Sequence, residues 1–125
     1  MNKTRILSLV SVAVAILCFL SSCKADFVGN SYKVNNKWYM DFSVLNRTEK
    51  KEFSLLRGDE ISVDIALTEG AVEIEILDGN KTPVYRGKDL VTERFSVVIP
   101  TDGRCSISVT GHNAKGKISF ENTGR

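Results

Sequence analysis

The chain has 125 residues, of which 42% are hydrophobic and 26% are charged, and its formal net charge at pH 7 is +2. The two excess positive charges, Lys3 and Arg5, lie at the N-terminus ahead of an apolar segment; without them, 15 basic residues face 15 acidic residues. This balance excludes the strongly basic surface on which nucleic-acid binding depends, so no nucleic-acid partner is expected. The length is that of one small domain.

The N-terminal segment has the three parts of a secretory signal peptide. Lys3 and Arg5 form a short basic region, residues 6–20 are almost uniformly apolar, and two serines follow. The apolar run, about 15 residues, is shorter than the roughly 20 residues that span a bilayer as a helix. We therefore predict a signal peptide over residues 1–22. An uncleaved N-terminal membrane anchor is the alternative.

The end of this segment, Leu20-Ser21-Ser22-Cys23, resembles the lipobox of bacterial lipoproteins. The resemblance implies cleavage between Ser22 and Cys23, a diacylglyceryl group on the Cys23 sulfur, and a further acyl chain such as palmitate on the new amine. A cysteine thiolate is a good nucleophile for accepting such a group. Two acyl chains hold a protein stably where one chain binds only marginally. The membrane is therefore an expected partner through this lipid, and no other cofactor is expected.

The lipobox also implies a location. We expect the bacterial cell envelope, on the outer side of the cytoplasmic membrane or, in a host with two membranes, at the outer membrane. Lys24 stands where an aspartate would indicate retention at the inner membrane. Residues 23–37 are mostly polar with little periodicity, and we interpret them as the lipidated Cys23 and a flexible tether. A flexible coil of this length extends about 20 Å.

From Trp38 onward, apolar and polar residues alternate with a period of two, which is typical of strands with one buried and one solvated face. Glu69-Gly70 and Gly111-His112-Asn113 are among the turn-forming separators. The pattern predicts an all-β domain over residues 38–122, a small antiparallel β-sandwich of about seven to eight strands, with a tail at 123–125. A small β-barrel is the alternative. The alternating segments are residues 38–44, 53–55, 61–67, 72–76, 84–85, 95–99, 105–109 and 118–120.

Few residues in this domain could carry metal or nucleophilic chemistry. Cys105 has no partner for an intramolecular disulfide once Cys18 is removed and Cys23 is lipidated, so we predict a buried strand cysteine. A nucleophile or an intermolecular bridge is the alternative. His112 is the only histidine and lies in a predicted turn, and the chain lacks the ligands of a zinc site. We therefore predict no catalytic residues and no metal site.

The acidic residues of the strands offer a second hypothesis. Glu73 and Glu75 alternate on one strand and point to the same side, about 7 Å apart. This spacing could suit the carboxylate pair of a glycoside hydrolase, with Asp64 as a further candidate. Alternating glutamates are more typical of a solvated sheet face. A small envelope hydrolase using these strand carboxylates remains the alternative to a non-catalytic protein.

Tyr39 is the candidate binding residue. It follows Trp38 on a predicted strand, so the two side chains face opposite sides of the sheet. If Trp38 fills the core with Met40 and Phe42, then Tyr39 is exposed. An exposed tyrosine on a sheet face can stack on a sugar or contact a protein partner.

Between residues 51 and 121 the strand and turn segments are Phe53-Ser54-Leu55, Gly58-Asp59, Ile61-Ser62-Val63-Asp64, residues 72–80, Phe95-Ser96-Val97 and residues 102–111. With these segments, residues 51–121 resemble the pre-peptidase C-terminal type of β-sandwich module of bacterial secreted proteins. This resemblance implies an accessory domain of the secreted or surface kind, usually without catalytic activity. The hypothesis is therefore a membrane-anchored cell-envelope lipoprotein with a non-catalytic β-sandwich that binds an envelope polysaccharide or a protein. A structural or inhibitory lipoprotein with a single protein partner is a further alternative.

Overall fold

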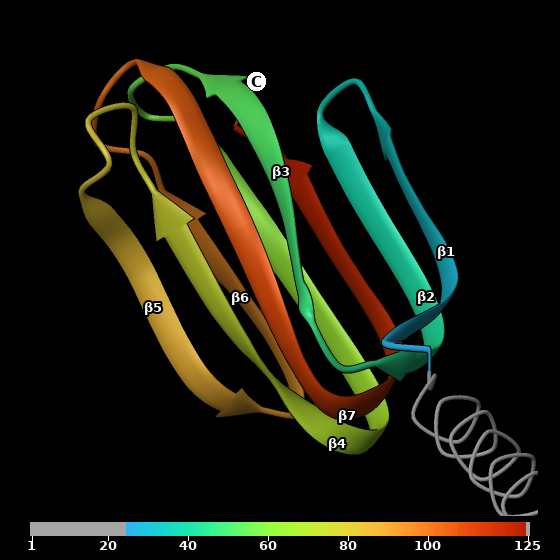
Figure 1. The fold of residues 1–125 in the computed structure, drawn as a ribbon. Helices are drawn as coiled ribbons and strands as arrows, with labels where there is room; N and C mark the ends of the chain where they lie inside the picture. Colours follow the sequence, from blue (N-terminus) through green and yellow to red (C-terminus); the bar gives the residue numbers. More distant parts are fainter. Residues whose placement is uncertain (1–24, 125) are drawn as a thin grey trace, which may run out of the picture.

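A computed structural model describes residues 25–124, and all of its regular structure is antiparallel β-strand (Figure 1). The predicted all-β fold class is confirmed. No helix long and apolar enough to cross a membrane occurs within residues 25–124. The strands are β1 (Phe27–Val34), β2 (Lys37–Leu45), β3 (Thr48–Leu55), β4 (Glu60–Leu77), β5 (Pro83–Leu90), β6 (Thr92–Val98) and β7 (Gly103–Asn122).

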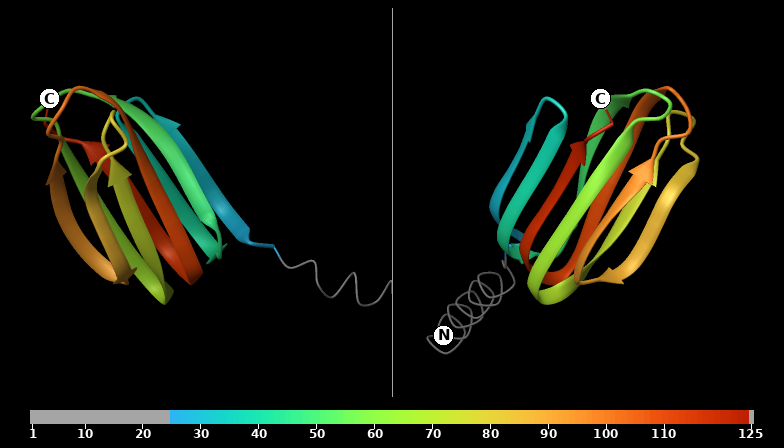
Figure 2. Two further views of the ribbon diagram at one scale, coloured as in Figure 1. Left: turned by 60° about the vertical axis from the view of Figure 1, so that its left-hand side comes forward. Right: turned by 180° about the vertical axis from the view of Figure 1, so that it is seen from behind.

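Two long strands organise the sandwich. β4 has 18 residues and β7 has 20, and they pair with each other along most of their length. Each bends midway, so each contributes to both layers (Figure 1; Figure 2). The first half of β4 pairs with β6 and the second half of β7 with β2, which continues to β1; together these make the five-stranded layer. The other halves pair with β5 and β3 and make the four-stranded layer.

The sheet is open. β1, β3, β5 and β6 each pair with a single neighbour among the described strands, so no ring of strands closes. This arrangement confirms the predicted sandwich rather than the small barrel. The number of strands also agrees with the prediction, although the segments differ. Residues 61–67 and 72–76 belong to the single strand β4, and residues 105–109 and 118–120 to the single strand β7.

The bends replace two predicted hairpin turns. At Glu69-Gly70 and at Gly111-His112-Asn113 the chain continues in the same strand, with register shifts between Leu67 and Ala71. Gly70 has a φ of 70°, and a Cβ there would lie 2.3 Å from the carbonyl oxygen of Asn113. The two bends therefore cross at a distance that only glycine permits.

The core lies between the layers and follows the predicted alternation. The ring of Trp38 in β2 stacks on that of Phe120 in β7, with centroids 5.2 Å apart, and both side chains are fully buried. Tyr85 of β5 and Phe95 of β6 contact each other across one open side of the sandwich, with centroids 4.7 Å apart. Cys105 is fully buried, as predicted. Isoleucine and valine side chains from β4 and β7 fill the centre.

The predicted tether is wrong for most of its length. β1 occupies residues 27–34 and pairs with β2 from Phe27↔Leu45 to Val34↔Lys37. The alternation was hidden because β1 is an edge strand that buries little: all of its residues except the half-buried Phe27 are exposed. The inward-facing positions of β1 include Gly29, Ser31 and Lys33 rather than large apolar residues.

The sandwich has two distinct ends. The basal end carries the start of β1 at Phe27 and the bends of β4 and β7, since Leu45 pairs with Ala114 there. The distal end carries the β1–β2 and β3–β4 turns and the end of β7 (Figure 1). There the Asp59 carboxylate accepts hydrogen bonds from Leu56 N at 2.9 Å and Asn122 Nδ2 at 3.1 Å. These bonds fasten the C-terminal end of β7 to the β3–β4 turn.

Candidate functional site

Tyr39 lies on the outer face of the five-stranded layer, opposite the buried Trp38, so the predicted facing of the two residues is correct. Tyr39 is half-buried rather than fully exposed, because a second tyrosine covers part of it. Tyr32 of β1 is its cross-strand partner, and the two ring centroids lie 5.3 Å apart at an angle of 37°. Tyr32 is 51% exposed. The sequence alone does not predict this pair, because Tyr32 lies in the predicted tether and β1 shows no alternation of buried and exposed residues.

A shallow hollow of about 160 Å³ lies beside Tyr39 on the same face. Its lining mixes an aromatic ring, an acid, a base and a hydroxyl: Tyr39, Asp64, Lys117 and Ser119, with Ala66 and Ile118 at its floor. The Asp64 carboxylate forms an exposed ion pair with Arg94, 3.0 Å away. We call Tyr32, Tyr39, Asp64, Lys117 and Ser119 the tyrosine face. Rings of this kind can stack on the apolar face of a sugar while the polar groups bond its hydroxyls.

The strand carboxylates of the hydrolase hypothesis are divided between the two layers. Glu73 and Glu75 lie on the outer face of the four-stranded layer and line a groove of about 400 Å³. Glu75 forms an ion pair with Arg86 at 2.7 Å, and Glu73 lies 3.6 Å from His112. Asp64 belongs to the five-stranded layer. The structure therefore brings Glu73 and Glu75 together, each facing a basic side chain, and places Asp64 elsewhere.

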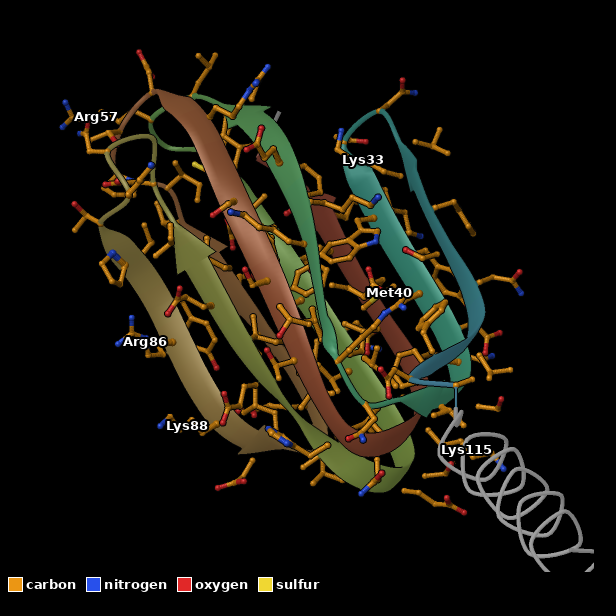
Figure 3. All side chains as sticks on the ribbon, viewed as in Figure 1. Lys33, Met40, Arg57, Arg86, Lys88 and Lys115 are labelled. Carbon is orange, nitrogen blue, oxygen red and sulfur yellow. The ribbon has the colours of Figure 1, made fainter. Side chains whose placement is uncertain are left out.

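The groove on the outer face of the four-stranded layer is lined mainly by polar side chains. Hydroxyl groups of Thr48, Ser108 and Thr110 run across its centre, and Arg86 and Lys88 project from β5 at its margin (Figure 3). Thr48 and Thr110 hydrogen-bond to each other at 2.7 Å. Glu73 and Glu75 thus lie on a solvated sheet face, as the alternation of polar and apolar residues in the sequence predicts.

A third groove, of about 510 Å³, lies at the distal end between the β1–β2 hairpin and β3. The Lys33 ammonium lies 4.8 Å from the centroid of the Phe53 ring, and Asn36 Nδ2 donates a 2.8 Å hydrogen bond to the carbonyl oxygen of Asn122. Arg104 and Glu52 line the other side. We call this the distal groove. The sequence alone does not predict this groove, since a third of its lining residues, Lys33, Asn35 and Asn36, belong to the segment predicted to be a tether.

Cys105 and His112 are placed as isolated groups. Burial raises the pKa of the Cys105 thiol, and the carboxylates of Asp78 and Asp59 raise it further. The thiol is therefore protonated at neutral pH, which favours a packing role over a nucleophilic one. His112 is exposed at the bend of β7. Within the part of the chain that the structure describes, no three His, Cys, Asp or Glu side chains gather as they would to hold a metal ion.

The predicted cleavage and lipidation positions, Ser22 and Cys23, lie outside the described residues. The structure shows how closely the fold follows them. The carbonyl oxygen of Asp26 accepts a 2.7 Å hydrogen bond from the backbone N–H of Asn46. This hydrogen bond lies three residues after Cys23 and one residue before the start of β1.

Comparison with known proteins gives no family. No family model matches the chain, and no curated protein matches it. Similar solved structures include one described as "CBM4 structure and function", at 14% identity over 81% of this chain and 77% of the other, with a TM-score of 0.40. A Drosophila melanogaster CENP-C structure with bound CAL1 has 8% identity, coverages of 93% and 99%, and a TM-score of 0.41. An RmlC-like cupin from Desulfovibrio desulfuricans has 15% identity, coverages of 76% and 81%, and a TM-score of 0.33. Likenesses at this level carry no functional argument.

Proposed function

We propose that this chain is a bacterial cell-envelope lipoprotein whose β-sandwich is a non-catalytic binding module, held to the membrane by acyl chains on Cys23. The observation that carries the proposal is the position of Cys23. It ends an apolar segment in the lipobox-like Leu20-Ser21-Ser22-Cys23, and the backbone of Asp26, three residues later, is already hydrogen-bonded to Asn46. A non-catalytic role is supported by the partners of the two strand glutamates: Glu75 forms an ion pair with Arg86 at 2.7 Å, and Glu73 lies 3.6 Å from His112.

The ligand that best suits the module is an envelope polysaccharide bound at the tyrosine face. Tyr32 and Tyr39 present a pair of rings beside the carboxylate of Asp64, the ammonium of Lys117 and the hydroxyl of Ser119. Sugars offer apolar C–H faces for stacking and hydroxyls for hydrogen bonding, so they match this combination of groups. The hollow is shallow and open, which suits an extended polymer better than an enclosed small molecule.

Lipidation is tested by metabolic labelling with a palmitate analogue. The wild-type protein is expected to be labelled and to fractionate with membranes, whereas Cys23→Ala should lose the label because the sulfur that accepts the diacylglyceryl group is gone. Cys18→Ala is the matched control, since Cys18 lies in the same apolar segment outside the lipobox. Labelling of Cys23→Ala at the wild-type level would contradict the proposal.

Binding is tested with the unlipidated domain, residues 24–125, against envelope extract separated into polysaccharide and protein fractions. Retention by polysaccharide is expected. Capture of one stoichiometric protein with no retention by polysaccharide would instead favour the interaction or inhibitory lipoprotein and would overturn the polysaccharide ligand.

A further inference from the structure

We propose that the basal end of the sandwich rests on the phospholipid headgroups of the membrane that holds Cys23, so that the distal end and its groove point away from that membrane. The inference rests on the proposed lipidation of Cys23. It adds an orientation, a contacting surface and a partner, which is the lipid headgroup layer.

The short chain between Cys23 and Asp26 limits the distance between the lipid and the domain. Asp26 is already bonded to Asn46 at the edge of the sheet, so only the steps from Cys23 to Asp26 separate the lipid from the fold. A fully extended chain covers at most about 3.5 Å per residue, which limits this span to roughly 11 Å. The lipidated residue lies at the membrane surface, so the start of β1 is held within about that distance of the headgroups.

The sandwich is longer than the chain that joins it to the lipid. β1 runs for 8 residues from the basal end to the distal end. At about 3.3 Å per residue, this strand alone is roughly 26 Å long. The segment from Cys23 to Asp26 is less than half as long as β1. It is therefore too short for the lipid on Cys23 to lie beside the turns at the distal end. The basal end is the part of the domain that the anchor holds at the membrane.

The side chains at the basal end suit contact with headgroups. The Arg47 guanidinium lies 5.3 Å from the centroid of the half-buried Phe27 ring and forms a 2.7 Å ion pair with Glu49. Val28 of β1 and Val91 of the β5–β6 turn are about half exposed. Lys115 projects from the bend of β7 at this end, whereas Arg57 and Lys33 lie at the other end (Figure 3). Aromatic and aliphatic groups together with the Lys115 ammonium suit the boundary between acyl chains and phosphates.

This orientation presents the candidate sites differently. Tyr32 lies five residues beyond Phe27 on β1, so the ring pair of the tyrosine face stands about 16 Å from the basal end, on a surface parallel to the strand axis. The distal groove is the site most remote from the membrane. A polymer in the envelope can therefore reach both sites without displacing the domain from the lipid.

The test uses the full lipidated chain reconstituted in vesicles of phosphatidylcholine and phosphatidylglycerol that contain a headgroup spin label. A fluorophore is attached through Asn113→Cys at the basal end or through Asn35→Cys at the distal end. The two positions are matched: both are exposed asparagines with a φ of 51°. The native Cys105 is fully buried and Cys23 carries the lipid, so the introduced thiol is the one labelled. We expect several-fold stronger quenching at Asn113→Cys. Equal quenching at the two positions, or stronger quenching at Asn35→Cys, would overturn the orientation.

A second variant tests the role of the short tether. About 15 Gly and Ser residues inserted between Lys24 and Ala25 would give a flexible coil of roughly 23 Å. The difference in quenching between the two positions should then fall by at least half. An unchanged difference would overturn the assignment of the orientation to tether length.

Palmitate labelling and flotation with vesicles separate this inference from the function on which it rests. An unlabelled protein that does not float overturns the lipoprotein proposal and the orientation together. A labelled protein that floats but shows equal quenching at both positions overturns the orientation alone.

Discussion

The sulfur of Cys105 lies in the core of the four-stranded layer, where its cross-strand neighbour is Phe53. Burial, with the carboxylates of Asp78 and Asp59, raises the pKa of this thiol above its ordinary value of 9.0. In the unfolded chain the thiol returns to that ordinary value. The thiol therefore binds its proton more tightly in the folded state, and folding and titration are linked.

The linkage predicts how stability depends on pH. Since the unfolded state loses this proton first, the contribution of Cys105 is fully present below pH 9 and declines as the pH rises above 9. Urea unfolding followed by Trp38 fluorescence should show a steeper loss of stability above pH 9 in the wild-type protein than in Cys105→Val. Burial, followed by the charge of Glu93, also raises the pKa of Tyr85 from 10.0, but this group is common to both proteins. Parallel pH profiles would refute the linkage.

The role proposed for Tyr39 predicts a loss of affinity on truncation. Tyr39→Ala removes one ring of the pair with Tyr32 and should weaken binding to the retaining polysaccharide by about 3- to 10-fold, the range that an aromatic contact supports. Val98→Ala is the control, because Val98 is exposed on β6 in the same layer and lies away from the hollow. Equal affinities of Tyr39→Ala and the wild-type protein would reject the tyrosine face.

At the scale of the elements, the bends of β4 and β7 are the most demanding features. Gly70 combines a positive φ with close contact to the opposite bend, where a Cβ would lie 2.3 Å from Asn113 O and 2.5 Å from His112 O. Gly58 also has a positive φ, of 90°, but nothing lies within 4 Å of the position that its Cβ would take. Comparison of Gly70 with Gly58 therefore separates the free-energy cost of a positive φ from the cost of steric contact with the opposite bend.

We predict that Gly70→Ala lowers the free energy of unfolding by about 2–4 kcal/mol, since backbone strain and a displaced bend add together. Gly58→Ala should lower it by only about 1 kcal/mol, because only backbone strain remains. Chemical denaturation of the two variants measures both values. A cost for Gly70→Ala no greater than that for Gly58→Ala would show that the crossing of the bends tolerates a side chain.

The sequence predicts some elements well and others poorly, for identifiable reasons. Alternation identified Trp38, Ile65 and Ile107 as core residues because a period of two needs only local information. It could not distinguish a bend from a hairpin at Glu69-Gly70, because the same turn-forming residues serve both. β1 escaped detection because an edge strand beyond the core has no need of buried apolar residues.

Some features of the candidate site could likewise be predicted from local sequence, and others could not. The outward facing of Tyr39 was predictable from its neighbour Trp38, and the placement of Glu73 and Glu75 on one face followed from strand geometry. The ring of Tyr32 beside Tyr39 and the distal groove depend on the pairing of β1 with β2 and its position opposite β3. Such pairings between strands are set by the assembled core, and a local pattern does not specify them.

At the scale of the whole molecule, the two layers share β4 and β7 and enclose one core. The pairings that build this core join distant parts of the chain. Trp38 pairs with Phe120, Ile61 with Asn122 and Phe53 with Cys105. A fold that depends on contacts of this kind must close long loops before its core forms.

The topology therefore predicts slow folding. We expect refolding in milliseconds to seconds, the range typical of all-β sandwiches dominated by long-range pairing. Trp38 is the only tryptophan and is fully buried, so stopped-flow fluorescence after dilution from urea reports core formation directly. Refolding within microseconds would mean that local structure rather than strand pairing limits the rate.

The direction in which the chain enters the sheet has a mechanical consequence for an anchored protein. Tension between lipid at Cys23 and a polymer held farther up the domain is directed along the axis of β1. Hydrogen bonds between β1 and β2 run perpendicular to that axis from Phe27 to Val34. The pulling force is therefore distributed over all of these bonds simultaneously. Had the chain entered β1 from the distal end, the same tension would open these bonds one after another. The edge strand that buries the least is thus loaded in shear, the geometry in which a short strand resists being pulled from its sheet.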